Sequence, residues 1–182
     1  MSKFRQKQFQ GKLYTFEHLK PIRLRVPLNA TKSLALELMV EFGCHCFTEE
    51  FDSQRHGLDH KYSHKNEVRA FDIERYECSL HLPAVINEMQ RGMIYKVDRS
   101  YTYAAHISLD SDNVPKTYSI FFSLAKVVCV DTFALKMFVK SAYLKPSVAK
   151  PNTQSWRFVS LAGQIAGAFP PKGKKVKPQQ KK

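Results

Sequence analysis

The sequence lacks the short motifs that mark most nucleotide-dependent enzymes and hydrolases. It contains no GxGxxG, GxxxxGK(S/T), HExxH or GxSxG, so dinucleotide-binding enzymes, P-loop enzymes, zincins and α/β-hydrolases have no motif support. No apolar run approaches the roughly 18 residues of a membrane span, and no apolar segment follows the basic N-terminus as in a secretory signal. We therefore expect a cytoplasmic protein that makes no contact with a membrane.

Cysteine is also scarce, and the 4 cysteines form no CxxC pair. This excludes a disulfide framework and a compact zinc knuckle, and it predicts reduced thiols. The spacing of His56, His60 and His64 would line one face of a helix and suit zinc or nickel, with the CHC at 44–46 as a source of soft ligands. Gly57 and the polar composition favour a solvated loop there, so no metal and no cofactor are expected.

Acidic residues are few, and the basic excess is concentrated at the two ends of the chain. The formal net charge is +13. Residues 1–26 carry seven basic groups and one acid, and residues 172–182 carry six lysines and no acid. Residues 27–90 carry six basic and eleven acidic groups, whereas residues 91–157 carry ten basic and four acidic groups. The second half of the middle region is therefore the half that a polyanion would prefer.

The last segment, PPKGKKVKPQQKK, is too poor in apolar residues to form a core. It is expected to be a disordered basic arm that adds salt-sensitive affinity for nucleic acid, or else a solubilising tail. Its candidate contacts with nucleic acid are Lys174, Lys175 and Lys177.

The first half of the chain predicts a basic N-terminal arm at 1–19, a strand at 22–26 and then helices. A short helix is predicted over 29–43, because Leu34, Leu38 and Phe42 recur at i+4. Residues 44–66 lack a sustained period and predict a long loop. Residues 67–92 predict a helix in two pieces, broken by Pro83.

The second half changes to a period of two. Strands are predicted at 93–97, 101–109, 117–130 and 135–144, followed by a closing helix within 152–169. The predicted fold class is α+β: N-terminal helices, an antiparallel meander sheet of about four strands, a C-terminal helix and the tail. One domain at 20–169 is expected, followed by the tail at 170–182.

The strand at 101–109 carries the first candidate site. Alternation places Tyr101, Tyr103 and Ile107 on the core side and His106 on the opposite face, among small polar residues. A histidine placed there near Arg99 and Lys140 has the chemistry for metal-independent RNA cleavage through the 2′-hydroxyl. An ordinary surface histidine fits the same pattern.

The last strand carries the second candidate site. Lys136, Phe138 and Lys140 share one face, which suits contact with a nucleic-acid backbone and base stacking. The same residues would equally suit a solvated sheet face. Ser141 and Tyr143 are phased with the apolar face.

The order of RAFDIERY, LPAVINEM, YTYAAHISL and FVKSAY over residues 67–145 resembles the barnase–EndoU–colicin–RelE class of small ribonucleases. The resemblance implies Ser141 and Tyr143 at the site, with Arg69, Arg75 or His106 contacting the phosphate. It therefore needs Ser141 on the working face, and a bulge near Ser141 would reconcile this with the alternation. The chain also resembles accessory proteins of bacterial prophages and genomic islands.

Together these features predict a nucleic-acid-interacting protein of a bacterial mobile element, with RNA favoured over DNA as its partner. Toxin-like, metal-independent endoribonuclease activity is one hypothesis, and a non-enzymatic regulatory or accessory protein that binds DNA or RNA is another. A third is a protein-interaction module whose acidic segment at 27–90 docks a basic partner. An acidic protein is a further candidate partner of this cationic chain.

Overall fold

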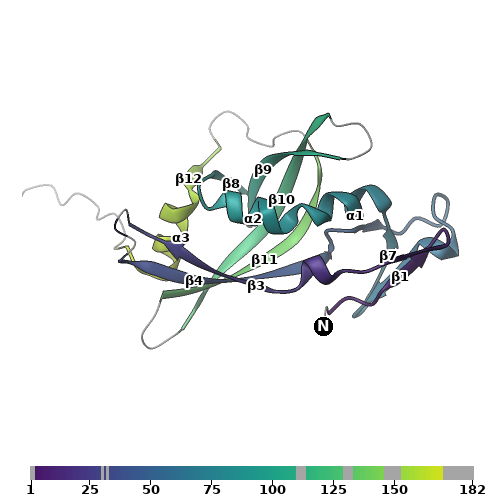
Figure 1. The fold of residues 1–182 in the computed structure, drawn as a ribbon, viewed down its shortest axis with the longest axis horizontal. Helices are drawn as coiled ribbons and strands as arrows, with labels where there is room; N and C mark the ends of the chain where they lie inside the picture. Colours follow the sequence, from purple (N-terminus) through teal and green to yellow (C-terminus); the bar gives the residue numbers. More distant parts are fainter. Residues whose placement is uncertain are drawn as a thin grey trace, which may run out of the picture.

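The computed structural model describes residues 3–29, 31, 33–109, 114–128, 133–145 and 153–169. Its centre is a seven-stranded sheet in which only β11 and β4 pair in parallel, all other neighbours being antiparallel. In order across the sheet, the strands are Ser155–Arg157 (β12), Met93–Val97 (β8), Ser100–Ser108 (β9), Pro115–Val127 (β10), Phe133–Leu144 (β11), Ala35–His45 (β4) and Ile22–Pro27 (β3) (Figure 1).

Short strands and 3-10 turns lie at one end of this sheet, and helices pack against it. The short strands there are Lys7–Phe9 (β1), Lys12–Tyr14 (β2), Thr48–Glu50 (β5), Lys61–His64 (β6) and Glu67–Phe71 (β7), and the 3-10 turns are Glu17–Leu19 (η1) and Leu58–His60 (η2). β1 pairs with β2, and β5-β7-β6 form a three-stranded sheet. The helices are Ile73–Leu80 (α1), Leu82–Met89 (α2) and Phe158–Ala166 (α3). None of the helices in the described part of the chain is long and apolar enough to cross a membrane.

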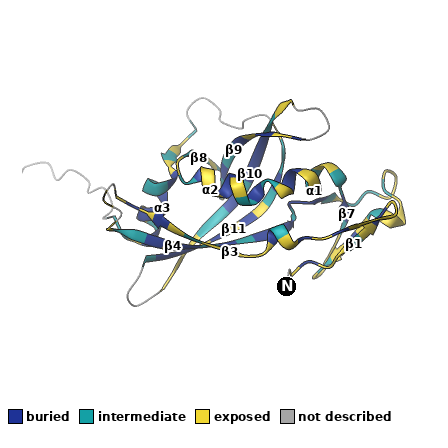
Figure 2. Cartoon of the chain, viewed as in Figure 1, coloured by how far each residue is buried: buried dark blue, intermediate teal, exposed yellow. Residues whose placement is uncertain are grey.

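The hydrophobic core lies between the central strands and the helices. Alternate residues of β4 and β11 are buried, and they join one cluster with buried residues of α1, α2 and α3. Figure 2 shows burial concentrated in the central strands and exposed residues along the outward side of α1. The opposite face of β3, β4 and β11 carries most of the exposed side chains of these strands, including Arg23, Arg25, Glu37, Lys136 and Phe138.

The predicted fold class is wrong in its order and its balance. Strands account for 51% and helices for 20% of the described residues, and the first part of the chain forms the strands β1 to β7, with α1 and α2 only after them. The sheet is also larger than four strands and mixed. The parallel pair arises because β4, from the first half of the chain, lies beside β11 from the second half. This long-range pairing leaves no local signal in either segment.

Most of the segment predicted as a helix at 29–43 lies in the strand β4. The prediction is wrong because the spacing of the apolar residues fits both structures. Leu38 and Phe42 are four residues apart, which fits one helix face but also one strand face. Leu36 and Val40 fill the intervening even positions and are buried as well, so the true period is two. Asn29 caps no helix; its side-chain oxygen accepts a hydrogen bond from the backbone of Leu34 in a loop.

Residues 67–92 contain the predicted break but begin as a strand. β7 occupies the start, where Val68 is exposed. α1 then starts at an N-cap, Asp72, whose side chain accepts a hydrogen bond from the backbone nitrogen of Arg75 at 2.8 Å. Pro83 lies in the first turn of α2, where a helix needs no backbone donor, so it separates two helices and disrupts neither.

Two segments predicted to be irregular contain regular structure. The predicted arm at 1–19 includes the β1-β2 hairpin, and Phe4, Phe9 and Phe16 in this segment are buried. The predicted loop at 44–66 includes β5 and β6. The strands β8 to β11 lie where the alternation predicts them, and the segment predicted as the closing helix contains α3 but begins with the strand β12.

Candidate functional site

The candidate catalytic residues predicted on β9 and β11 do not share one place. His106 is exposed on β9 opposite Thr117, on the face that the alternation predicts. Arg99 is in the turn before Ser100, whose hydroxyl lies 2.9 Å from Nζ of Lys140. Ser100 and His106 are six positions apart in β9, which is roughly 20 Å at about 3.3 Å per residue. The structure therefore brings Arg99 and Lys140 to the same end of β9 and leaves His106 near the other.

A register shift near the end of β11 changes the face of Ser141. Val139 pairs with Phe122 and Ser141 pairs with Phe121, so Lys140 is an extra residue relative to β10. This is the bulge that the ribonuclease resemblance requires. Ser141 therefore leaves the buried face of Val139 and joins the face of Phe121.

Tyr143 and the two predicted phosphate-binding arginines meet at this end of the sheet. The ring of Tyr143 stacks on Phe121 with centroids 5.3 Å apart, and the Arg75 guanidinium lies 4.9 Å from the Tyr143 ring. Both arginines are also held by Thr48: Arg75 donates to its carbonyl at 2.9 Å and Arg69 to its hydroxyl at 2.8 Å. These bonds attach β7 and α1 to β5, which gives Arg69 and Arg75 a structural role.

The predicted nucleic-acid face of β11 is only partly available. Lys136 forms an ion pair with Glu41 at 2.8 Å, so its charge is locally balanced. Phe138 is 36% exposed, which is unusual for a phenylalanine in a sheet. The predicted tail contacts Lys174, Lys175 and Lys177 lie outside the described residues.

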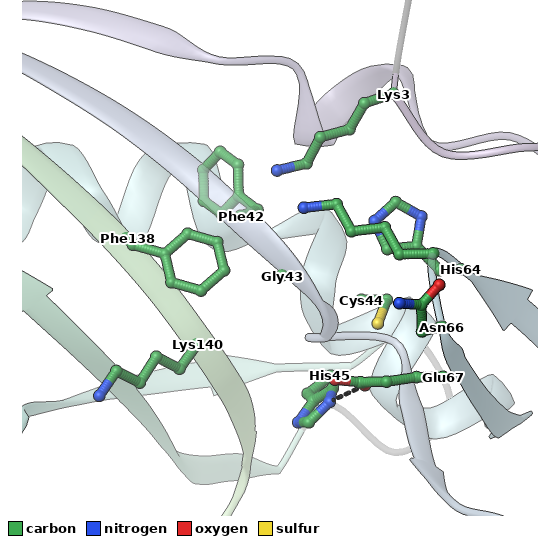
Figure 3. A pocket seen from close by; sticks show the side chains of 11 residues that line it. Lys3, Phe42, Gly43, Cys44, His45, His64, Asn66, Glu67, Phe138 and Lys140 are labelled. Carbon is green, nitrogen blue, oxygen red and sulfur yellow. Dashed lines mark hydrogen bonds and ion pairs between the residues drawn. The ribbon is translucent and has the colours of Figure 1, made fainter.

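A pocket of about 540 Å³ opens beside Phe138, and we call it the lysine groove (Figure 3). It lies between the ends of β4 and β11, the turn that joins β6 to β7, and the N-terminal segment. Its polar lining is mostly cationic or neutral, with a single carboxylate. The lining residues are Lys3, Phe42, Gly43, Cys44, His45, His64, Lys65, Asn66, Glu67, Phe138 and Lys140.

Gly43 explains how β4 and β11 form the floor of this groove. A Cβ atom at Gly43 would lie 2.8 Å from the carbonyl oxygen of Lys140 and 3.3 Å from the Phe138 ring. Only glycine allows the two backbones to approach this closely. The pairing of β4 with β11 shifts at this point, between the pairs Val139–Phe42 and Ser141–His45.

The third wall of the groove is the tight turn between β6 and β7. His64 pairs with Glu67 across the turn, and Lys65 takes the left-handed conformation with φ of 54°. The turn carries Asn66 to the groove and sets Glu67 beside β4, where its Oε2 lies 2.7 Å from Nε2 of His45.

The groove perturbs the titration of several of these groups. Burial lowers the pKa of Lys3, partly offset by the charge of Glu41. Burial and the nearby charges of Lys65 and Lys3 lower the pKa of His64, so this imidazole is neutral at pH 7. The hydrogen bond from His45 lowers the pKa of the Glu67 carboxyl, which is therefore ionised.

The sequence reasoning missed most of this site. The sequence predicts Lys3 in an arm and Lys65 and Asn66 in a loop, and it indicates His45 only as part of CHC. A usable local signal was the alternation on both sides of the Lys65–Asn66 pair, which is typical of a hairpin. The meeting of this hairpin with β4 and β11 has no signature in any one segment.

The three histidines predicted as low-ranking metal ligands are not aligned on a helix. Residues 58–64 form η2 and β6 instead. The ring centroids of His56 and His60 are 5.3 Å apart, and Nε2 of His56 lies 2.8 Å from Oε1 of Glu49, within hydrogen-bond distance. His64 packs instead against Phe4, with ring centroids 5.0 Å apart.

The fold and the groove define a mostly β protein with a mixed sheet and a cationic surface site. A family model described as the YjaZ family matches residues 6–166, and the chain belongs to that family. No curated protein and no solved structure matches the chain.

Proposed function

We propose that this protein binds single-stranded nucleic acid in the lysine groove, with RNA preferred over DNA. The observation that carries the proposal is the arrangement of Lys3, Lys65 and Lys140 in the lining around the exposed ring of Phe138. Nζ of Lys3 lies 5.6 Å from the centroid of this ring. Sites for single strands combine cations that track the backbone with an aromatic ring on which a base stacks.

The polar groups in the groove support RNA as the preferred ligand. Asn66 and His45 offer hydrogen-bonding groups beside the lysines, and a 2′-hydroxyl both donates and accepts hydrogen bonds. A pocket of about 540 Å³ lies within the usual size range of ligand sites, about 300–1,000 Å³. A single unpaired nucleotide, rather than a duplex, is the kind of ligand that such a pocket receives.

The proposed function is binding rather than cleavage, because His106 lies away from Arg99 and Lys140. Endoribonuclease activity stays a prediction of the ribonuclease resemblance, and a role in a mobile element stays a prediction as well. We place the protein in the cytoplasm, where nucleic acid is accessible. The described cysteines, Cys44, Cys46 and Cys78, are free, in keeping with a reducing compartment.

The direct test is fluorescence anisotropy of short labelled oligonucleotides titrated with the purified full chain. We expect saturable binding of single-stranded RNA, weaker binding of the same sequence as DNA, and the weakest binding of duplex RNA. The integrity of the RNA afterwards, with and without EDTA, reports cleavage separately. Equal affinity for all three ligands, or competition by an acidic peptide as effective as that by RNA, would contradict the proposal.

A further inference from the structure

Three potential metal ligands converge at one end of the lysine groove. One ligand atom each from Cys44, His45 and Glu67 lies within 4.8 Å of the other two. Figure 3 shows the Cys44 sulfur on the same side of the pocket as the His45–Glu67 pair. Cys44 is 5% exposed, His45 is half-buried and Glu67 is exposed, so the cluster runs from the protein interior to the groove.

The convergence depends on the irregularity in β4. Cys44 and His45 are adjacent, and in a regular strand their side chains would point to opposite faces. Between the pairs Phe42–Val139 and His45–Ser141, β4 advances three residues while β11 advances two. A bulge of this kind re-aims a side chain, and bulges are frequent beside functional sites. The structure therefore shows a cause for the shared direction of two neighbouring ligands.

We propose that Cys44, His45 and Glu67 bind one divalent transition-metal ion, zinc by the chemistry of its ligands, with a fourth position open to the lysine groove. A thiolate, an imidazole and a carboxylate are all zinc ligands, and three protein ligands with one open position are typical of zinc sites that bind an external molecule. Either water or a phosphate oxygen of a ligand in the groove completes the coordination.

The distances allow this with small movements of the side chains. Zinc bonds of about 2.0–2.3 Å in a tetrahedron separate the ligand atoms by roughly 3.3–3.8 Å. The His45 and Glu67 atoms are now 2.7 Å apart, and the Cys44 atom lies no farther than 4.8 Å from either. The histidine and carboxylate atoms must therefore separate slightly, and the sulfur must approach. Glu67 is exposed and free to move in this way.

The local charges also fit. A thiolate and a carboxylate together neutralise the two charges of the metal, so the occupied site is neutral. The neighbouring cations, Lys65 and Arg69, therefore oppose the ion little. The donor set excludes magnesium and calcium as preferred ions, because both require oxygen ligands.

This site does not rest on nucleic-acid binding, and it is tested without nucleic acid. Full-length protein freed of metal by a chelator is titrated with Co²⁺, which reports a thiolate ligand by a charge-transfer band in the near-ultraviolet. We expect one equivalent to saturate this band and Zn²⁺ to displace the cobalt. The Cys44→Ser variant should lose the band and bind Zn²⁺ at least about 100-fold more weakly. Loss of a residue that only supports a ligand costs up to about 100-fold in metal affinity, and loss of a direct ligand should cost no less.

Matched variants make the outcome decisive. The Cys78→Ser variant removes a buried thiol on α1 and should keep the band. Because Cys44 is buried and its replacement could impair folding, Glu67→Gln provides a second variant at an exposed position, with at least about 10-fold weaker Zn²⁺ binding expected. The proposal is overturned if the wild type shows no cobalt band. It is also overturned if the band survives in Cys44→Ser, if Glu67→Gln binds Zn²⁺ as tightly as the wild type, or if the metal is lost in His56→Ala instead.

Discussion

Nε2 of His45 lies 2.7 Å from Oε2 of Glu67, and this contact joins the last residue of β4 to the first residue of β7. It connects the seven-stranded sheet to the three-stranded sheet at the edge of the lysine groove. Neither side chain is deeply buried, since His45 is 37% and Glu67 57% exposed at the side chain. The pair is therefore accessible to a ligand in the groove, and it should contribute little to the stability of the fold.

The first prediction follows from this exposure. Replacing His45 with Ala should lower the free energy of unfolding by less than about 1 kcal/mol, because exposed ion pairs contribute little. Urea denaturation of His45→Ala, Glu67→Ala and the double variant measures the coupling between the two side chains. A coupling above about 2 kcal/mol would show that the pair is instead part of what holds the two sheets together.

Substitution of Gly43 should lower the stability of the protein far more than substitution of His45. The Gly43→Ala variant places a methyl group 2.8 Å from the backbone oxygen of Lys140, which cannot rotate away. We expect a loss of about 1–3 kcal/mol of stability, the usual cost of overpacking. Gly57→Ala is the matched control, because the only close contact of its new Cβ is with the Asp59 carboxylate, a side chain rather than backbone, and it should change stability by less than about 0.5 kcal/mol. Equal losses in both variants would disprove the close approach of β4 and β11.

Phe138 should contribute to affinity through stacking. Removing the ring in Phe138→Ala is expected to weaken binding of single-stranded RNA by about 1–3 kcal/mol, the range measured for base–aromatic stacking. Leu13→Ala, which removes another exposed apolar side chain on β2, is the control and should leave the affinity unchanged. Anisotropy titrations of the two variants at the same salt concentration compare them. Retention of full affinity by Phe138→Ala would remove stacking from the proposal.

The parts of the fold that could be predicted are those with a clear local period. The sequence predicts β9 and β11 because apolar residues recur at every second position over most of each segment. It does not predict β4, since Leu34, Leu38 and Phe42 fit a helix as well as a strand, and local spacing alone does not separate the two. The segment forms a strand because it pairs in parallel with β11. This contact joins distant parts of the chain, so local spacing could not predict it.

The candidate site was harder to predict because it depends on three irregularities. Lys140 is a bulged residue, Gly43 permits a close approach, and Lys65 turns the hairpin in a left-handed conformation. Each moves a side chain away from where regular alternation would place it. The sequence-based hypothesis places His106 together with Lys140, and their separation along β9 appears only in three dimensions.

A pH-dependent loss of stability is predicted from His18. Burial lowers the pKa of His18 to about 4 from the ordinary 6.5, and Nε2 lies 2.8 Å from the Ser79 hydroxyl. The unfolded chain therefore binds a proton more readily between pH 6.5 and pH 4, so stability falls as the pH falls through this window. Allowing for solvent screening, the loss is about 1–2 kcal/mol. Urea midpoints of wild type and His18→Gln between pH 7 and pH 4 measure it, and identical slopes would contradict the assignment.

The most direct test of the account is the salt dependence of RNA affinity after removal of the groove lysines. The variant Lys3→Ala/Lys65→Ala/Lys140→Ala is compared with Lys12→Ala/Lys96→Ala/Lys126→Ala, which removes the same charge from exposed positions elsewhere. For single strands the logarithmic salt slope changes by about 0.7 for each phosphate contact, so the groove variant should lose about 2 from its slope and the control almost nothing. Equal slopes in the two variants would show that RNA does not bind in the lysine groove.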